Sequence, residues 1–289
     1  MNEPAGLTKK PVLIHSAASL QDYVDCPRRY YLRHVQKLAW PAIQSEPVLE
    51  NELWMQQGAR FHQMVHRSLL GIPDDLLSSH VHEPDLQRWW NQFQSARQSG
   101  TLEILREAPS RLFPEITLSQ PLAGARLLAK CDLILARSVG EVLIYDWKTA
   151  RKRLSRPWLA ARLQTRVYPY LVARSGSGWN DSLSITPDQL KMIYWFADYP
   201  AQPEVFPYST EQFQADERYL SGLIEEIAKL EQADFKPTEQ TERCRFCVYR
   251  SYCDRGTAAG DLGSVENWEE NETPGEIGFD FDQVGEIVF

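Results

Sequence analysis

The sequence predicts an α/β fold in which a mixed central sheet is flanked by helices. Two observations carry this prediction. Apolar residues recur at helical spacing in the N-terminal third, follow strand-like patterns across the middle, and return to helical spacing further on. Helices, then strands, then helices are typical of a sheet wrapped by a helical layer. The second observation is the length of 289 residues, which suits a large core in one or two domains.

Helices are predicted in the N-terminal third of the chain. Ser16 or Ser19 can cap a first helix, because apolar residues follow at helical spacing. A second and stronger helix is predicted over residues 50–70 and ends at Gly71. A third helix, amphipathic and rich in aromatic side chains, is predicted over residues 85–98.

The apolar pattern then changes to that of strands. Three strands are predicted over residues 115–122, 125–138 and 141–149, and a short turn at Gly140 joins the last two. Helical spacing returns over residues 155–174.

Two more strands and a helix are predicted in the rest of the domain. A buried strand is expected over residues 190–199, and Pro207 makes residues 204–209 an edge strand. A long helix over residues 210–232 precedes a compact cysteine segment, residues 244–253.

These patterns divide the chain into three parts. Residues 1–15 are predicted to be a loose lead-in, residues 16–257 one folded domain, and residues 258–289 an acidic tail without stable structure. No apolar run approaches the roughly 20 residues of a membrane helix, and the N-terminus lacks the apolar core of a signal peptide. We therefore expect a cytoplasmic protein without a membrane partner.

Composition places the chain among ordinary globular proteins, with 43% hydrophobic and 24% charged residues. The formal net charge is −8, but residues 261–289 hold nine acids and no Lys or Arg, which leaves a nearly neutral body. Residues 126–174 hold eleven Lys and Arg against three acids. This basic middle is compatible with a polyanionic partner, although an ordinary solvated surface explains the charges as well.

Charged residues end the apolar strand predicted over residues 141–149. Asp146 and Lys148 lie two residues apart, so they share one face of that strand. Asp132 lies in the preceding strand, within an otherwise apolar run, and an unpaired carboxylate there would be costly to bury. Two such aspartates can bind one divalent cation, and the lysine can orient water or offset charge on a phosphate. A buried Asp–Lys salt bridge explains the three residues equally well.

Regular alternation predicts the faces of the second of the three strands. Lys130, Asp132 and Ile134 are expected on one face, with Cys131 and Leu133 on the other.

The segment CDLILARSVGEVLIYDWKTARKR resembles the D…(D/E)-x-K core of the PD-(D/E)XK nuclease superfamily and is similar to that of its RecB-like branch. The resemblance implies a restriction-endonuclease-like fold with Asp132, Asp146 and Lys148 as catalytic residues. The segment GARFHQMVH resembles the G-x-x-x-H helix motif of the same branch and implies that His62 is a metal ligand. It further implies that Mg²⁺ or Mn²⁺ binds His62, Asp132, Asp146 and the backbone carbonyl of Trp147.

The segment LQTRVYPYL resembles the Q-x-x-x-Y helix motif of this branch, which implies that Gln164 and Tyr168 contact DNA. The two residues are four apart, so they lie on one helix face. The basic run Arg151, Lys152 and Arg153 precedes them and is expected to bind the nucleic-acid backbone. A polar pair that caps the sheet is the alternative for Gln164 and Tyr168.

Other positions match the family less closely. His66 lies one turn after His62 and is the alternative ligand, and Glu115 matches a carboxylate that many relatives carry near the site. Ala129 stands where relatives often have glycine. Pro169 interrupts a helix that relatives usually continue, so the path of DNA across this helix is less certain than the metal site.

Four of the five cysteines fall in two short segments far apart in the sequence. Such spacing in a reducing compartment is typical of a metal site rather than of disulfides, and it suits zinc or an iron–sulfur cluster. A cysteine followed by PRRY, with C-x2-C-x5-C near the C-terminus, resembles the iron–sulfur RecB-like nucleases. The resemblance implies a 4Fe–4S cluster that joins N- and C-terminal helical segments through Cys26, Cys244, Cys247 and Cys253. Cys131 is then left as a buried strand thiol.

The resemblance implies a metal-dependent DNA nuclease, an exonuclease on single-stranded ends that acts in DNA repair, recombination or CRISPR-type DNA processing. Two alternatives remain. One is a non-cleaving DNA-binding scaffold subunit, and the other is a zinc-stabilised module within a helicase–nuclease or adaptation complex. The sequence contains no G-x-x-x-x-G-K-(S/T) motif, so we expect any helicase partner to be a separate chain.

Overall fold

The computed structural model describes residues 13–38, 48–79, 81–102, 110–138, 140–176, 178–179 and 185–256. The predicted tail and most of the predicted lead-in lie outside these ranges. No described helix combines the length and the apolar character that crossing a membrane requires.

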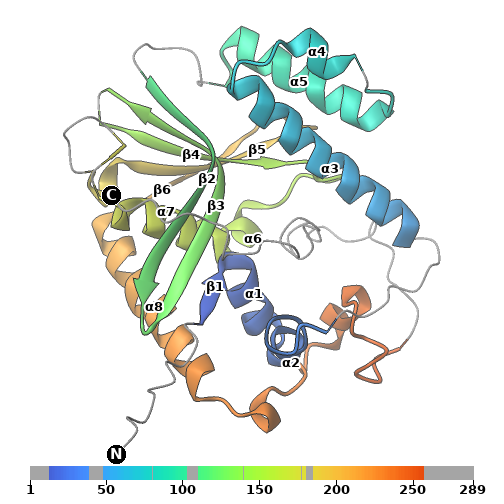
Figure 1. The fold of residues 1–289 in the computed structure, drawn as a ribbon, viewed down its shortest axis with the longest axis vertical. Helices are drawn as coiled ribbons and strands as arrows, with labels where there is room; N and C mark the ends of the chain where they lie inside the picture. The colour runs from blue at the N-terminus through green and yellow to red at the C-terminus, as the bar shows by residue number, and fades with distance from the viewer. Residues whose placement is uncertain are drawn as a thin grey trace, which may run out of the picture.

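A six-stranded mixed sheet forms the centre of the fold, which confirms the α/β prediction (Figure 1). The strand order is β1-β3-β4-β5-β6, and β2 pairs with β3. The β1–β3 and β4–β5 pairs are parallel, and the other pairs are antiparallel. The strands are β1 (Ile14–Ser16), β2 (Ser110–Leu122), β3 (Ala125–Arg137), β4 (Val142–Lys148), β5 (Leu190–Phe196) and β6 (Glu204–Pro207).

The strand β1 includes residues 14 and 15, the last two of the predicted loose lead-in. It begins at Ile14, and all three of its residues pair with β3. The sequence pattern missed this strand because it is short and its partner lies more than a hundred positions further along the chain. Folded structure therefore begins earlier than predicted.

Strand β3 pairs with different neighbours along its length, and this division positions the site. It pairs with β1 through Leu128 and with β4 from Leu133 onward. Asp132 thus lies immediately before the pairing with β4 begins. Strand β4 continues beyond this point and pairs with β5 as far as Lys148.

Helices cover both faces of the sheet (Figure 1). One face carries α3 (Val48–Leu69), α4 (Asp74–Ser78) and α5 (Pro84–Ser99). The other face carries α1 (Ala17–Asp25), α2 (Pro27–Tyr30), α6 (Arg156–Ala161), α7 (Gln164–Arg174) and α8 (Thr210–Lys229). Short helices complete the described chain: a π-helix at Tyr31–Val35 and 3-10 helices at Pro187–Gln189, Gln232–Asp234 and Thr241–Phe246.

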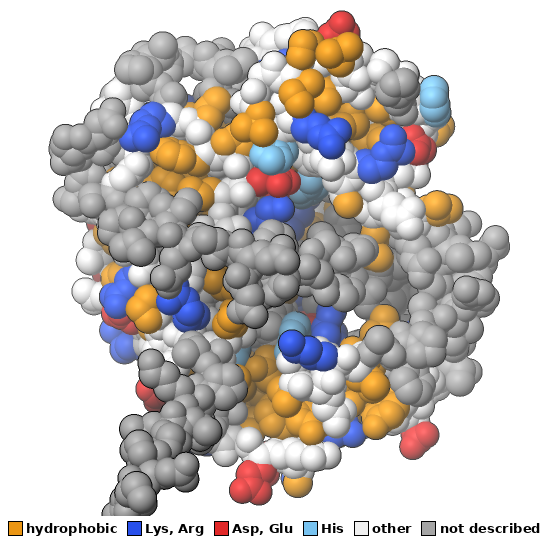
Figure 2. Space-filling view, viewed as in Figure 1, with side chains coloured by type: hydrophobic (Ala, Val, Ile, Leu, Met, Phe, Trp, Pro, Cys, Tyr) orange, Lys and Arg blue, Asp and Glu red, His pale blue; other side chains and the backbone are white. Residues whose placement is uncertain are grey.

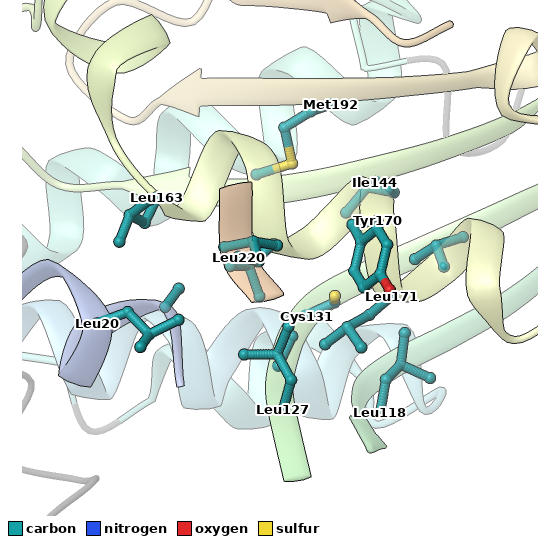
Figure 3. Close-up of a cluster of buried hydrophobic side chains, with 14 of the residues drawn as sticks. Leu20, Leu118, Leu127, Cys131, Ile144, Leu163, Tyr170, Leu171, Met192 and Leu220 are labelled. Carbon is teal, nitrogen blue, oxygen red and sulfur yellow. The ribbon is translucent and has the colours of Figure 1, made fainter. Parts of the chain in front are cut away.

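The core consists of two apolar clusters, one on each face of the sheet. The cluster under α3 and α5 is dominated by aromatic side chains such as Phe61, Trp89 and Trp195. The cluster on the other face joins the sheet to α1, α7 and α8, as Figure 3 shows. Cys131 is fully buried in this second cluster, which confirms the prediction of a buried strand thiol.

The predicted alternation of faces along β3 is wrong at one point. Cys131 and Ile134 pack in the same cluster, whereas Leu133 packs in the cluster under α3. Residues three apart lie on opposite faces of a regular strand, so the alternation is interrupted next to Asp132. The residue opposite Asp132 in the register of β2 is Glu115, whose φ of +49° lies in the left-handed region that side chains other than glycine rarely adopt.

Candidate active site

The middle of β3 and the end of β4 bring the predicted catalytic residues together. Lys148 Nζ lies 3.1 Å from Asp146 Oδ2, and both side chains are buried. Asp132 Oδ2 accepts a hydrogen bond of 2.8 Å from the backbone N–H of Trp147, which lies between them in β4. The Trp147 peptide and both carboxylates therefore meet where β3 and β4 part.

Helix α3 adds His62 to this group. His62 Nδ1 lies 3.1 Å from Asp132 Oδ1. Gly58, one turn earlier, faces Thr149 just after β4, and a Cβ at this position would lie 2.8 Å from the Thr149 hydroxyl. The glycine of the G-x-x-x-H motif thus lets α3 approach the end of β4, and the histidine then reaches the carboxylate.

Helix α7 contacts the same group from the other face of the sheet. Gln164 Nε2 donates to Asp146 Oδ1 at 2.5 Å, and Gln164 Oε1 accepts from Lys148 Nζ at 3.1 Å. Both β4 residues therefore share the face toward α7, as their two-residue spacing predicts. Tyr168 lies one turn further along α7, which continues through Pro169 to Arg174.

Two pKa shifts describe the electrostatics of the site. Burial would lower the pKa of His62, but the charge and hydrogen bond of Asp132 outweigh burial and raise it. Burial would raise the pKa of Asp132, but the His62 charge and hydrogen bond lower it, with help from the Trp147 N–H and Lys148. The raised pKa favours a proton on His62 beside Asp132, and a metal ion held by both residues would compete with that proton.

Tyr168 lies beside the same carboxylates. Burial, and then the charges of Asp146, Cys131 and Asp132, raise the pKa of its hydroxyl well above the usual range. The hydroxyl therefore stays protonated and can act as a hydrogen-bond donor at this site.

A second acid–base cluster lies next to the first. His66 Nδ1 is 3.2 Å from Glu115 Oε2, and Lys130 Nζ is 3.1 Å from the same oxygen. His62 and His66 thus reach Asp132 and its opposite residue Glu115 from successive turns of α3. Figure 2 shows histidine, acidic and basic side chains gathered in the middle of the molecular face that it presents. The sequence analysis did not assign Lys130 to the site, although its position two residues before Asp132 in an apolar strand was a usable signal.

The structure divides the basic run after β4. Arg151 and Lys152 are exposed. Arg153 instead forms an ion pair with Glu204 of β6 and donates to the carbonyl of Gln202 at 3.3 Å. Arg153 therefore holds the loop to the sheet, which the sequence did not reveal because Glu204 is distant in the chain.

The two cysteine-bearing segments lie side by side. The Cys26 Sγ accepts a hydrogen bond of 3.4 Å from the Thr238 N–H. Burial raises the pKa of Cys247 to about 11, with smaller upward contributions from Cys26 and Cys253. Among the residues that the structure describes, however, no group of three or more His, Cys, Asp or Glu side chains is arranged to hold a metal ion. The four-cysteine cluster with Cys244 and the metal site of His62, Asp132 and Asp146 therefore both stay predictions.

The site offers a defined chemistry. Two carboxylates face a single lysine, and carboxylate oxygens are the ligands that Mg²⁺ and Mn²⁺ prefer. A lysine and a protonated hydroxyl beside such ligands can contact a phosphate and the water that attacks it.

A comparison with protein families agrees with this chemistry. A family model described as the PD-(D/E)XK nuclease superfamily matches residues 15–254. The fold is weakly similar to that of a protein designated SSO0001, with a TM-score of 0.43 and 13% identity over 85% of this chain and 87% of that one. A protein from Eubacterium rectale, provisionally named an exonuclease, gives a TM-score of 0.46 and 11% identity over 77% of this chain and 82% of that one. No curated protein matches the sequence significantly.

Proposed function

Because the chain belongs to the PD-(D/E)XK nuclease superfamily, we propose that it is a metal-dependent deoxyribonuclease that hydrolyses phosphodiesters at the Asp132–Asp146–Lys148 site. The observation that carries the proposal is the meeting of two carboxylates and one lysine where β3 and β4 part. A salt bridge built only for stability would not require a second carboxylate beside the first.

The residues fit a hard divalent cation. Asp132 and Asp146 would supply carboxylate oxygens, the Trp147 carbonyl a backbone oxygen, and His62 an imidazole nitrogen. Bound Mg²⁺ or Mn²⁺ supplies Lewis acidity toward a phosphate oxygen and lowers the pKa of water.

The other side chains act on the phosphate and the water. Lys148 lies 3.1 Å from both Asp146 and Gln164, so its ammonium group is held in one place, where it can orient the attacking water and offset negative charge on the phosphate. Gln164 fixes the relative positions of Asp146 and Lys148 by hydrogen bonding to both. The Tyr168 hydroxyl remains a donor to the DNA strand because its pKa is raised by burial.

The preferred substrate in this proposal is a single-stranded DNA end, cleaved exonucleolytically during repair, recombination or CRISPR-type processing. The RecB-like order of the motifs around His62, Asp132, Asp146 and Gln164 supports this substrate, and exposed basic residues beside the site support nucleic-acid binding. A helicase or other DNA-processing chain is the proposed partner.

A 4Fe–4S cluster on Cys26, Cys244, Cys247 and Cys253 is the proposed second cofactor. Its support is the set of four thiols in adjoining segments, together with the buried Arg29, which lies near Cys247 and Cys26. A buried arginine beside thiolates or an anionic cluster offsets their charge. Iron and sulfide analysis of anaerobically purified protein tests this, and one tightly bound zinc without iron would contradict it.

The nuclease proposal is tested with end-labelled single- and double-stranded DNA and anaerobically purified protein in Mg²⁺, Mn²⁺ or EDTA. We expect stepwise shortening of single strands in Mg²⁺ or Mn²⁺, none in EDTA, and none for Lys148→Ala. Internal cuts would show that the protein is an endonuclease rather than an exonuclease. DNA binding without cleavage in either metal would favour the non-cleaving scaffold and overturn the proposal.

A further inference from the structure

Trp54 and Arg151 form a cation–π pair at the edge of the candidate active site. Trp54 lies on α3, and Arg151 follows Lys148 by three residues. The guanidinium carbon of Arg151 lies 4.6 Å from the centroid of the Trp54 ring. The ring is partly exposed and the arginine is exposed, so the pair faces solvent.

Contacts to the end of β4 and to α5 hold the pair in place. Trp54 Nε1 donates a hydrogen bond of 3.1 Å to the Thr149 carbonyl, directly after Lys148. The ring packs edge-to-face against Trp89, with centroids 4.8 Å apart and planes at 82°. Gly58 brings this part of α3 close to Thr149. The ring is therefore a rigid support whose position relative to the active site is set.

Helical spacing gives the position of the pair along the site. Trp54, Gly58 and His62 follow one another at intervals of four residues, so they lie along one side of α3. The eight residues from Trp54 to His62 correspond to about 12 Å of helix. This is several times the roughly 3.4 Å axial rise per nucleotide of one strand in duplex DNA. A phosphate at Arg151 would therefore not be the one held at the carboxylates.

The Arg151 side chain is arranged to receive a phosphate. The guanidinium group lies over the Trp54 ring, and an arginine held in this way can still offer its N–H groups to a bidentate ligand. Among the described residues Arg151 has no ion-pair partner, whereas Arg153 and Arg156 both pair with Glu204.

We propose that Trp54 and Arg151 form a subsite that binds a backbone phosphate a few nucleotides from the scissile one, independently of base sequence. The inference rests on the proposed nuclease function and identifies which residue of the basic run binds the DNA strand. Arg151 is the phosphate ligand, and Trp54 is the residue that positions it.

Binding is measured in an Asp146→Asn background with a short fluorescent thymidine oligonucleotide over a range of salt concentrations. Adding Arg151→Ala should weaken binding about tenfold and reduce the slope of log affinity against log salt by about 0.7. Trp54→Leu should weaken binding about threefold, because the guanidinium loses its support, whereas Trp54→Phe keeps an aromatic face and should bind nearly as well as the background. Arg174→Ala is the matched control, because it removes an arginine from the far end of α7.

Kinetics separate this subsite from the chemistry. In otherwise wild-type protein, Arg151→Ala should raise KM for the oligonucleotide about tenfold and leave kcat unchanged. It should not affect hydrolysis of thymidine 5′-(p-nitrophenyl phosphate), which has one phosphodiester and no neighbouring phosphate. Lys148→Ala should abolish hydrolysis of both substrates.

An Arg151→Ala variant with an unchanged salt slope, or with equal losses on both substrates, would overturn the subsite. If wild-type protein hydrolyses neither substrate in Mg²⁺ or Mn²⁺, the nuclease function fails. The binding measurements then still decide whether Arg151 contacts a phosphate.

Discussion

Two largely buried groups of charged residues in this protein differ in their charge balance. In the candidate active site, two acids, Asp132 and Asp146, lie beside one permanent cation, Lys148, because His62 carries a charge only while it is protonated. The adjoining Glu115–Lys130 pair does not change this balance. On α1, Asp22 and Asp25 form ion pairs with four arginines: Arg29, Arg33, Arg162 and Arg243. These six residues are here called the α1 network.

The difference shows that buried charge alone does not mark a functional site. Acids that outnumber the nearby cations favour a divalent metal ion, whereas acids enclosed by arginines are already neutralised. The α1 network joins α1 to the α6–α7 junction through Arg162 and to the cysteine-bearing 3-10 helix through Arg243. It therefore ties the two ends of the described chain together through ion pairs.

The largest expected effect tests the acid excess of the active site. Asp146→Asn should reduce cleavage by about 10³-fold or more, because it removes a metal ligand and the partner of Lys148. Its free energy of unfolding in EDTA should fall by less than that of the matched variant below, because relief of the repulsion between two like charges partly offsets the loss of the Lys148 partner. Cleavage assays and urea unfolding measure the two quantities. Near wild-type cleavage by this variant would show that the active site lies elsewhere.

The matched change in the α1 network should do the reverse. Asp25→Asn leaves the buried Arg29 with fewer partners and should lower the free energy of unfolding by about 3 kcal/mol. Cleavage per folded molecule should stay within about threefold of wild type, because Asp25 does not contact the candidate metal ligands. Loss of cleavage as complete as in Asp146→Asn, with stability retained, would contradict the comparison.

A third test uses His15, which is buried against Tyr30 beside the α1 network. Burial, and then the charge of His34, lower the pKa of His15 from 6.5 to about 4. The unfolded chain therefore binds the proton more readily between these pH values, so stability is present above pH 6.5 and falls as the pH drops toward 4. From pH 7 to pH 5 this loss should be about 2 kcal/mol.

Replacing His15 by Phe should flatten this part of the curve of unfolding free energy against pH. His82 is exposed, so His82→Gln is the control and should keep the wild-type slope. An unchanged slope in His15→Phe would show that other groups of the α1 network cause the pH dependence.

The smallest expected effect concerns Tyr168 in the active site. Tyr168→Phe should reduce cleavage about tenfold, because one hydrogen bond to the substrate is lost. The alkaline side of the pH–rate profile should not change, since burial and the neighbouring carboxylates keep the hydroxyl protonated. An alkaline limb present in the wild type and absent from the variant would show that Tyr168 titrates during the reaction.

Much of the candidate site could be predicted from local sequence. The two-residue spacing of Asp146 and Lys148 placed both on one face of β4, and the four-residue spacing of Gly58 and His62 placed both on one face of α3. Such spacings are set by the backbone geometry of one element, so a single segment contains the information.

The roles of other residues depended on distant partners. Arg151 and Arg153 look alike in the sequence, yet Trp54 holds one at the surface and Glu204 pairs with the other. Lys130 joined the site through Glu115, which lies on a different strand. No pattern within the run after β4 distinguishes these arginines.

The sequence by itself determined the kinds and order of most elements and, in β4 and α3, which residues share a face. Only the tertiary structure decided that β1 pairs with β3, that side-chain alternation breaks beside Asp132, and that α3 crosses the end of β4 at Gly58. The physical reason is that periodicity follows from local backbone geometry, whereas strand pairing and helix packing depend on which distant surfaces bury each other's apolar area. The two carboxylates of the candidate site were visible in the sequence, but their convergence required the fold.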